Sequence, residues 1–134
     1  MSSIVSFIIS SFKKNQIIDI TNEIHNIVTN ANVCEGVCMV FVPHTTCAIS
    51  INENADPDVK KDMILGLNNI SPGNSEYGHI EGNSDAHIKA SLIGPSETII
   101  IDKGKLILGM WQGIYFCEFD GPRERKVLVK ILEG

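Results

Sequence analysis

The sequence predicts an α+β domain with about seven strands, three helices and a mostly antiparallel strand order. Three observations lead to this fold class. Segments rich in Val, Ile, Phe and Thr recur along the chain, and two stretches, 19–31 and 57–70, place apolar residues at helical spacing instead. With 134 residues, of which 43% are hydrophobic, the chain has the size and core content of a single domain spanning 1–134.

The first half begins with a strand at 3–12, "SIVSFIISSF", followed by the helix 19–31. Asp19 or Thr21 can cap this helix. Its apolar stripe consists of Ile20, Ile24, Ile27, Val28 and Ala31. His25 lies off that stripe and is interpreted as a solvated residue. Two strands rich in β-branched residues follow, at 36–43 and 46–52.

The second half begins with a strong helix start. Asp56 is a suitable N-cap, Pro57 fits the first helical position, and Asp58 adds an acid in the first turn. The helix 57–70 directs Val59, Met63, Leu67 and Ile70 to one face and leaves Ile64 and Leu65 off that face. The remaining elements are a polar, Gly-rich loop at 71–83, a short helix at 84–93, and strands at 97–102, 105–109, 111–119 and 125–132. Gly104 is expected at a positive-φ position in the turn "DKGK".

Composition excludes several classes of function. The net charge of −5 argues against broad nucleic-acid binding, which requires a basic face. No stretch approaches the ~18 apolar residues of a membrane span, and "MSSIVSFIISSFKKN" lacks the charge order of a signal peptide. Four cysteines are too few for a disulfide scaffold at this length, and Cys38 is expected in the core. We therefore expect a soluble, cytoplasmic protein without nucleic-acid or membrane partners.

Three of the four histidines lie outside regular apolar faces: His44 at a strand end, His79 in the Gly-rich loop and His87 on the short helix. Neutral imidazole is the commonest metal ligand, and three of them can hold Zn²⁺ with a fourth position open. The chain has no H-E-x-x-H motif and no paired CxxC, so three unrelated histidines are the alternative interpretation.

Other polar residues extend this candidate site. Asp56 and Asp58 are explained by helix capping, whereas Glu53 and Asp85 are free to orient a histidine or to act as general base. Trp111 is either a core anchor or a flat wall for an aromatic substrate. The turn "FDGPRER" carries Arg123 and Arg125, whose guanidinium groups either fork onto a phosphate or form surface salt bridges.

Three segments, "HTTCAISINENADPDVKKDM", "GHIEGNSDAHIKASLIG" and "GKLILGMWQGIYFCEFDGPR", occur in the order seen in the YjbQ family. This family of small bacterial and archaeal proteins is often labelled secondary thiamine-phosphate synthase, and the resemblance covers nearly the whole chain. It implies a compact sandwich of antiparallel sheet and helices that assembles as a homotrimer. Met110 departs from the family's usual Thr, and the loop "EGNSDAH" is shorter and less acidic than in some relatives.

The resemblance also implies site roles. It implies a divalent metal, Zn²⁺ or, with a diphosphate substrate, Mg²⁺, held by His44, His79 and His87. The other positions that match family motifs are Glu53, Asp85 and Arg123, expected to be catalytic, and Asn54, Trp111 and Gln112, expected to bind substrate. The expected function is a metal-dependent enzyme for a small-molecule substrate, joining an aminopyrimidine diphosphate to a thiazole phosphate. The alternatives are a metal-dependent hydrolase of a phosphorylated or heteroaromatic molecule and a non-catalytic small-molecule-binding protein.

Overall fold

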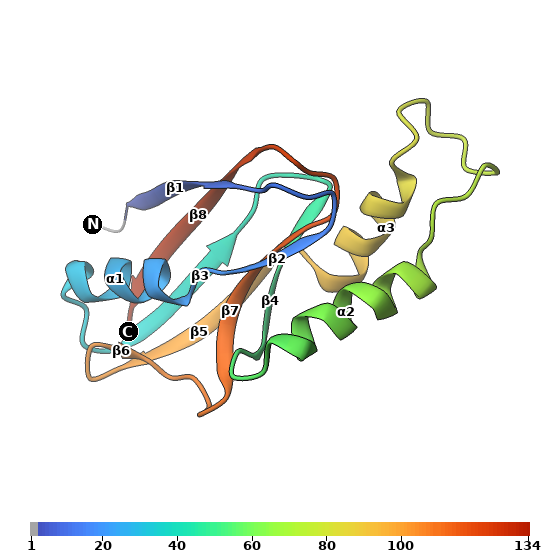
Figure 1. Ribbon diagram of the computed structural model, residues 1–134. Helices are drawn as coiled ribbons and strands as arrows, with labels where there is room; N and C mark the ends of the chain where they lie inside the picture. Colours follow the sequence, from blue (N-terminus) through green and yellow to red (C-terminus); the bar gives the residue numbers. More distant parts are fainter. Residues whose placement is uncertain (1–2) are drawn as a thin grey trace.

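Two antiparallel sheets face each other, and three helices pack around them (Figure 1). The structure is a computed structural model and describes residues 3–134. The larger sheet has the order β1 (Ile4–Ser10), β8 (Glu124–Glu133), β3 (Gly36–Phe41), β5 (Ser96–Asp102) and β6 (Lys105–Leu106). The smaller sheet has the order β2 (Gln16–Asp19), β7 (Gln112–Glu118) and β4 (Cys47–Glu53). The helices are α1 (Thr21–Ala31), α2 (Pro57–Ile70) and α3 (Ser84–Ile93). The expected α+β class is confirmed.

The main core lies between the two sheets. Strand residues alternate between the faces, so β3 directs Cys38 and Val40 inward, and β8 does the same with Val127 and Val129. Four members of the apolar stripe predicted for α1 contribute to this core: Ile20, Ile24, Ile27 and Val28. The fifth, Ala31, is exposed, and so is His25, as expected. The burial of Cys38 confirms the prediction made from its apolar surroundings.

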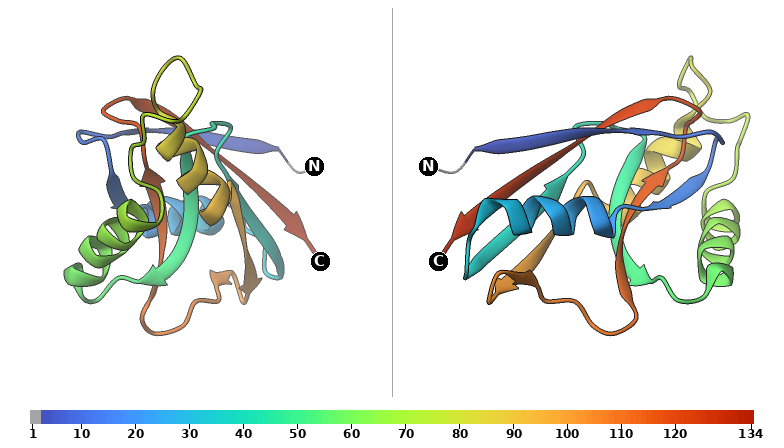
Figure 2. Two further views of the ribbon diagram at one scale, coloured as in Figure 1. Left: turned by 90° about the vertical axis from the view of Figure 1, so that its right-hand side faces the viewer. Right: turned by 60° about the vertical axis from the view of Figure 1, so that its left-hand side comes forward.

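A second core lies between the smaller sheet and helices α2 and α3. Both helices lie on one side of the molecule in Figure 1 and again in the right-hand view of Figure 2. Strand β7 is therefore buried on both faces. Ile64 of α2 packs into this core, contrary to the expectation that it lies free, whereas Leu65 is 61% exposed.

The helix and turn predictions were the most accurate. Helices 57–70 and 84–93 have the predicted bounds, and Asp56 caps the first of them by accepting the Asp58 N–H at 2.9 Å. Gly104 has a φ of +77°. No helix of residues 3–134 is long and apolar enough to cross a membrane.

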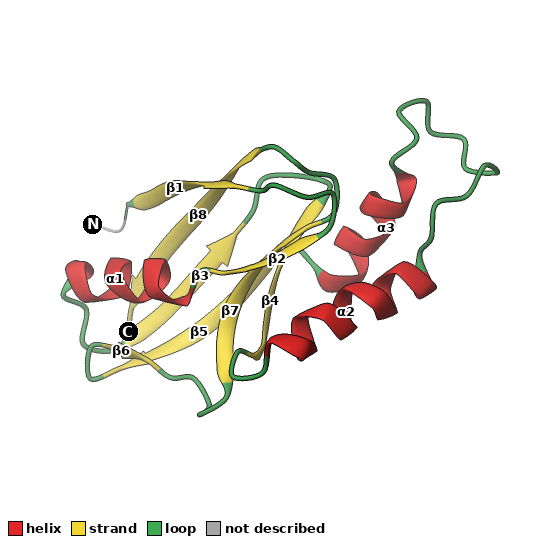
Figure 3. Ribbon diagram, in the orientation of Figure 1, coloured by secondary structure: helices red, strands yellow, loops and turns green. Residues whose placement is uncertain are grey.

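Two strand predictions were wrong. Strand β2 was missed, because four residues directly before a helix are too few to show the alternating pattern of a strand. Its position in the smaller sheet is set by its pairing with β7. The strand expected at 105–109 ends at Leu106, since only Lys105 and Leu106 pair with β5. Between α2 and α3 the predicted loop 71–83 projects away from both sheets (Figure 3).

Candidate functional site

A polar hollow of about 360 Å³ lies where four segments of the chain meet. These segments are the connection between β3 and β4, the loop before α3, α3 itself, and the turn between β7 and β8. The hollow is lined by Pro43, His44, Thr45, Thr46, His79, Glu81, Asn83, His87, Asp120, Arg123 and Arg125. The structure thus brings together all three predicted metal-ligand histidines and Arg123.

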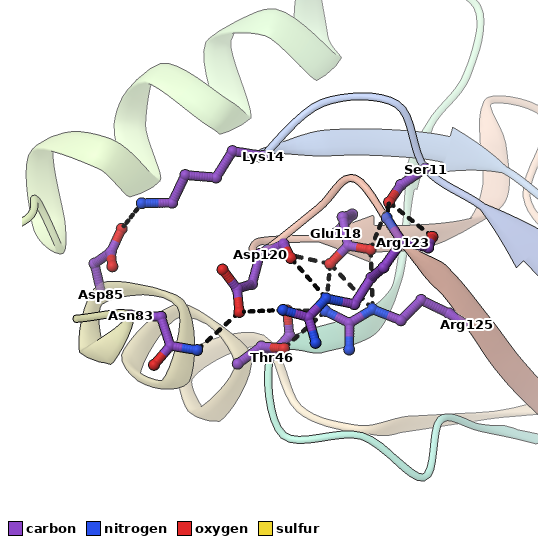
Figure 4. Close-up of polar contacts among 9 residues, drawn as sticks. All are labelled: Ser11, Lys14, Thr46, Asn83, Asp85, Glu118, Asp120, Arg123 and Arg125. Atoms are coloured by element: carbon purple, nitrogen blue, oxygen red, sulfur yellow. Dashed lines mark hydrogen bonds and ion pairs between the residues drawn. The ribbon is translucent and has the colours of Figure 1, made fainter. Parts of the chain in front are cut away.

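A buried ion pair forms the foundation of this hollow (Figure 4). Arg125 is 3% exposed and Glu118 is fully buried. Arg125 donates through Nε and Nη2 to the Glu118 carboxylate, and Nη2 also donates to Thr46 Oγ1 at 2.7 Å. Glu118 accepts two more hydrogen bonds, from Ser11 Oγ at 2.7 Å and from the Asp120 N–H at 3.1 Å. Because every charge has partners, the pair fixes the start of β8 rigidly beneath the hollow.

Arg123 is held in the same region by a second carboxylate. Its Nη2 donates to Asp120 Oδ2 at 2.8 Å and its Nε donates to the Asp120 carbonyl at 2.9 Å. Asn83, at the start of α3, donates to the same Oδ2 at 2.7 Å. The tight turn before Arg123 requires Gly121, because a Cβ there would lie 2.3 Å from the Lys13 carbonyl oxygen. Half of the Arg123 side chain remains exposed toward solvent.

The His44 side chain accepts a backbone hydrogen bond from β8 at a point beyond the end of β3. Strand β3 ends at Phe41, and the His44 Nε2 accepts the Lys126 N–H of β8 at 2.9 Å. A neutral imidazole that accepts through Nε2 carries its proton on Nδ1. Burial, reinforced by the positive charge of Arg125, holds the pKa of His44 below its ordinary value. At neutral pH His44 is therefore an uncharged ring whose remaining polar group is an N–H donor.

His79 and His87 lie close together in the same hollow. Their ring centroids are 5.2 Å apart and the rings are perpendicular. Two imidazoles that bind one tetrahedral Zn²⁺ through bonds of about 2.0–2.1 Å have centroids roughly 5 Å apart. The spacing of this pair therefore fits a shared metal ion.

The complete set of three histidines fits less well. Within residues 3–134, no three His, Cys, Asp or Glu side chains are arranged to hold a metal. The reason at His44 is its hydrogen bond, since a nitrogen that accepts the Lys126 N–H has no lone pair left for a metal. The role of His44 as third ligand stays a prediction that requires this bond to be given up.

Asp85 is not among the residues that line the hollow. Its carboxylate accepts Lys14 Nζ at 2.8 Å and lies 3.8 Å from Lys89 Nζ, so it joins α3 to the β1–β2 connection. Burial alone would raise the pKa of Asp85, but the Lys14 hydrogen bond and the two lysine charges outweigh it and hold this pKa below its ordinary value. In this arrangement Asp85 stabilises the helix that carries His87, and its catalytic role stays a prediction.

The remaining predicted residues lie at the other end of β4. Glu53 ends this seven-residue strand, which spans about 20 Å from the His44 end. The Asn54 N–H donates to the Trp111 carbonyl at 2.9 Å, and the Gln112 side chain accepts the Gly109 N–H at 2.7 Å. Trp111 is 59% exposed, so its interpretation as a core anchor was wrong. Within one chain these four residues are neighbours of one another and not of the histidines.

Four residues of the hollow and its foundation were assigned no role from the sequence: Thr46, Asn83, Glu118 and Asp120. Arg125 was expected to fork onto a phosphate or to form a surface salt bridge, whereas its ion pair with Glu118 is buried. Arg125 shares the inward register of Val127 and Val129, and Glu118 interrupts an apolar run. One charged residue in the inward register of each of two buried strands, Arg125 in β8 and Glu118 in β7, is the sequence signal that could have predicted a buried ion pair.

Cys47, which follows Thr46, is excluded as a nucleophile. Burial raises the pKa of its thiol to about 12, so the reactive thiolate is absent at neutral pH. The polar side chains that line the hollow carry imidazole, guanidinium, carboxylate, hydroxyl and amide groups.

The fold and the hollow define a class of small two-sheet α+β proteins with a histidine- and arginine-lined site at one end of the sandwich. The family model described as UPF0047 protein YjbQ-like matches residues 6–134, and the chain belongs to this family. A UPF0047 protein of Methanocaldococcus jannaschii is 52% identical over 124 residues, which cover 92% of this chain and 90% of that protein. YugU of Bacillus subtilis is 47% identical over 125 residues, covering 92% and 95%.

Solved structures of other members of this family have the same fold as this chain. An uncharacterized YjbQ/UPF0047 protein from Clostridium acetobutylicum has 54% identity and a TM-score of 0.94, with 96% of this chain and 99% of that chain covered. A YbjQ-like protein of unknown function from Sulfolobus solfataricus has 30% identity and a TM-score of 0.95, with 100% and 99% covered. The fold is thus shared across the family at widely differing identities.

Proposed function

We propose that the protein is an enzyme that acts on a phosphorylated small molecule bound in the polar hollow. The observation that carries this proposal is the meeting of three histidines and two arginines, from four separate segments, in one hollow. Its volume, about 360 Å³, lies within the range of small-molecule sites.

Hydrolysis of a phosphate ester suits the hollow better than the joining of two heteroaromatic rings. Trp111, the expected stacking surface, lies at the far end of β4. Arginine forks are suited to phosphoryl oxygens. Asp120 is engaged by Arg123 and Asn83, which leaves Glu81 as the carboxylate of the hollow that can accept a proton from water.

A divalent ion is part of this proposal. His79 and His87 would hold Zn²⁺, for which imidazole is a suitable ligand, whereas Mg²⁺ would be held mainly by the oxygens of the substrate. Either ion would polarise a phosphoryl oxygen. The chain's own residues orient the ester, hold its charge and move the proton.

The test is turnover of a panel of phosphomonoesters with and without added Zn²⁺ or Mg²⁺. Phosphate release that falls at least ~100-fold in His87→Ala supports the proposal. The matched control is His25→Ala, which removes an exposed histidine on α1. If the protein instead releases pyrophosphate from the aminopyrimidine diphosphate and thiazole phosphate, the thiamine-phosphate synthase activity is the correct assignment. Binding without turnover of either kind would identify a small-molecule-binding protein.

The proposal includes a homotrimer in the cytoplasm, where the four free cysteines stay reduced. Support for assembly comes from the outer face of the larger sheet, where neighbouring strands expose apolar side chains: Ile4, Ile8, Met39, Phe41, Ile100 and Leu132. Light scattering should give three times the 14.7 kDa chain mass. Met39→Lys should lower that mass, whereas Ile70→Lys should not, because Ile70 lies exposed at the end of α2, away from the larger sheet. A wild-type monomer would refute the trimer.

A further inference from the structure

We propose that Arg125, Arg123 and His44 form a seat for a phosphate group at the floor of the polar hollow. This inference rests on the proposed function and deepens it, because it names the chemical group by which the substrate is recognised: a phosphate monoester.

Arg125 provides the fixed part of the seat. Its Nε and Nη2 are committed to Glu118 and Thr46, while its Nη1 has no hydrogen-bond partner among residues 3–134. The side chain is 97% buried by these contacts and still lines the hollow. A guanidinium held on one edge and free on the other is pre-organised for an anion, since little side-chain freedom is lost on binding.

Arg123 provides a second guanidinium in the same arrangement. Asp120 binds its Nε and Nη2, and its Nη1 likewise has no partner in the described part of the chain. In Figure 4 the unbonded ends of both guanidinium groups point the same way. Both arginines line the hollow, and both charges act on His44. The free Nη1 groups come from residues two positions apart, Arg123 at the end of the turn and Arg125 in β8, and can therefore reach one ligand.

His44 adds an uncharged donor. Its Nε2 is occupied by the Lys126 N–H, so the Nδ1–H is the group available to a ligand. Phosphate has three strong acceptor oxygens and its best partners are charge-assisted donors. Glu118 and Asp120 already neutralise the two arginines, so the seat contributes directed donors and not a large net charge. Three donors from three side chains match the oxygens of a phosphate group better than the two oxygens of a planar carboxylate.

The test uses inorganic phosphate as probe, titrated into the full-length protein by ³¹P NMR and calorimetry, with acetate for comparison. Arg125→Lys keeps the charge and removes the fork, and Arg123→Gln removes one charge. Each should weaken phosphate binding about tenfold or more. Lys126→Gln is the matched control, since it removes one charge from the next residue, whose side chain lies outside the hollow. It should change affinity less than about twofold. Acetate should bind at least about tenfold more weakly than phosphate.

A second measurement covers the case in which Arg125→Lys does not fold. In the ¹⁵N-labelled wild-type protein, phosphate should shift the guanidinium signals of both arginines and leave His44 protonated on Nδ1. Phosphate binding that leaves these signals unchanged, or that survives Arg125→Lys in a folded protein, overturns the seat. Phosphate binding at the seat without turnover of any phosphate ester would contradict the proposed function alone, so the two failures are distinguishable.

Discussion

Replacing Glu118 by Leu should destabilise the protein severely. The change removes the partner of Arg125, which is 3% exposed, and also the acceptor of the Ser11 hydroxyl. Breaking a buried ion pair by removing one member costs about 3–5 kcal/mol, because the other charge stays buried without compensation. For a chain of this size that loss corresponds to a fall in Tm of roughly 10–20 °C.

The double variant separates this explanation from simple loss of packing. Combining Glu118→Leu with Arg125→Met removes both charges and keeps the volume, so the free energy of unfolding should return to within about 1–2 kcal/mol of wild type. The free energy of unfolding is measured for wild type, both single variants and the double variant by urea unfolding followed by circular dichroism, at one protein concentration. A Glu118→Leu protein less than about 1 kcal/mol below wild type, or a double variant as unstable as the sum of its single changes, would refute the reasoning.

Four further predictions follow from named contacts. His87→Ala should weaken Zn²⁺ binding about 100-fold by calorimetry, with His25→Ala unchanged. Asp56→Ala should lower the free energy of unfolding by about 1 kcal/mol, because the Asp58 N–H loses its acceptor; an unchanged urea midpoint would contradict the cap. Glu53→Gln should leave stability within about 0.5 kcal/mol, and a large loss of turnover in that folded protein would show that the far end of β4 reaches the chemistry. The pKa of Asp85 is depressed, so its stabilisation is present above the ordinary carboxyl pKa and is lost as the pH falls through the folded value. Acid titration of Asp85→Asn should therefore show a smaller loss of stability below about pH 4 than wild type shows.

Local signals in the sequence were sufficient for the helices and for much of the sheet. Asp56 and Pro57 specify a helix start through capping and a fixed φ, and this physics acts within a few residues. The inward alternation along β3 and β8 likewise follows from side-chain period alone. By contrast, β2 exists because β7 offers it a partner almost a hundred residues away, and no local pattern contains that information.

The candidate site also has features that could be predicted from the sequence and features that could not. Residue chemistry was enough to single out His44, His79, His87 and Arg123, and the fold brings these together. Their separation from Glu53 could not be predicted, because it depends on the length and direction of β4 between two segments that lie close in sequence. The bond from Lys126 to the His44 ring depends on where β3 ends, which is set by the packing of the whole sheet.

A crystal structure of the protein grown with a phosphomonoester tests the central claim most directly. We expect the phosphate in the polar hollow, within hydrogen-bond distance of Arg123 and Arg125 and with one phosphoryl oxygen directed toward His79 and His87. A ligand bound beside Trp111 and absent from the hollow would contradict it.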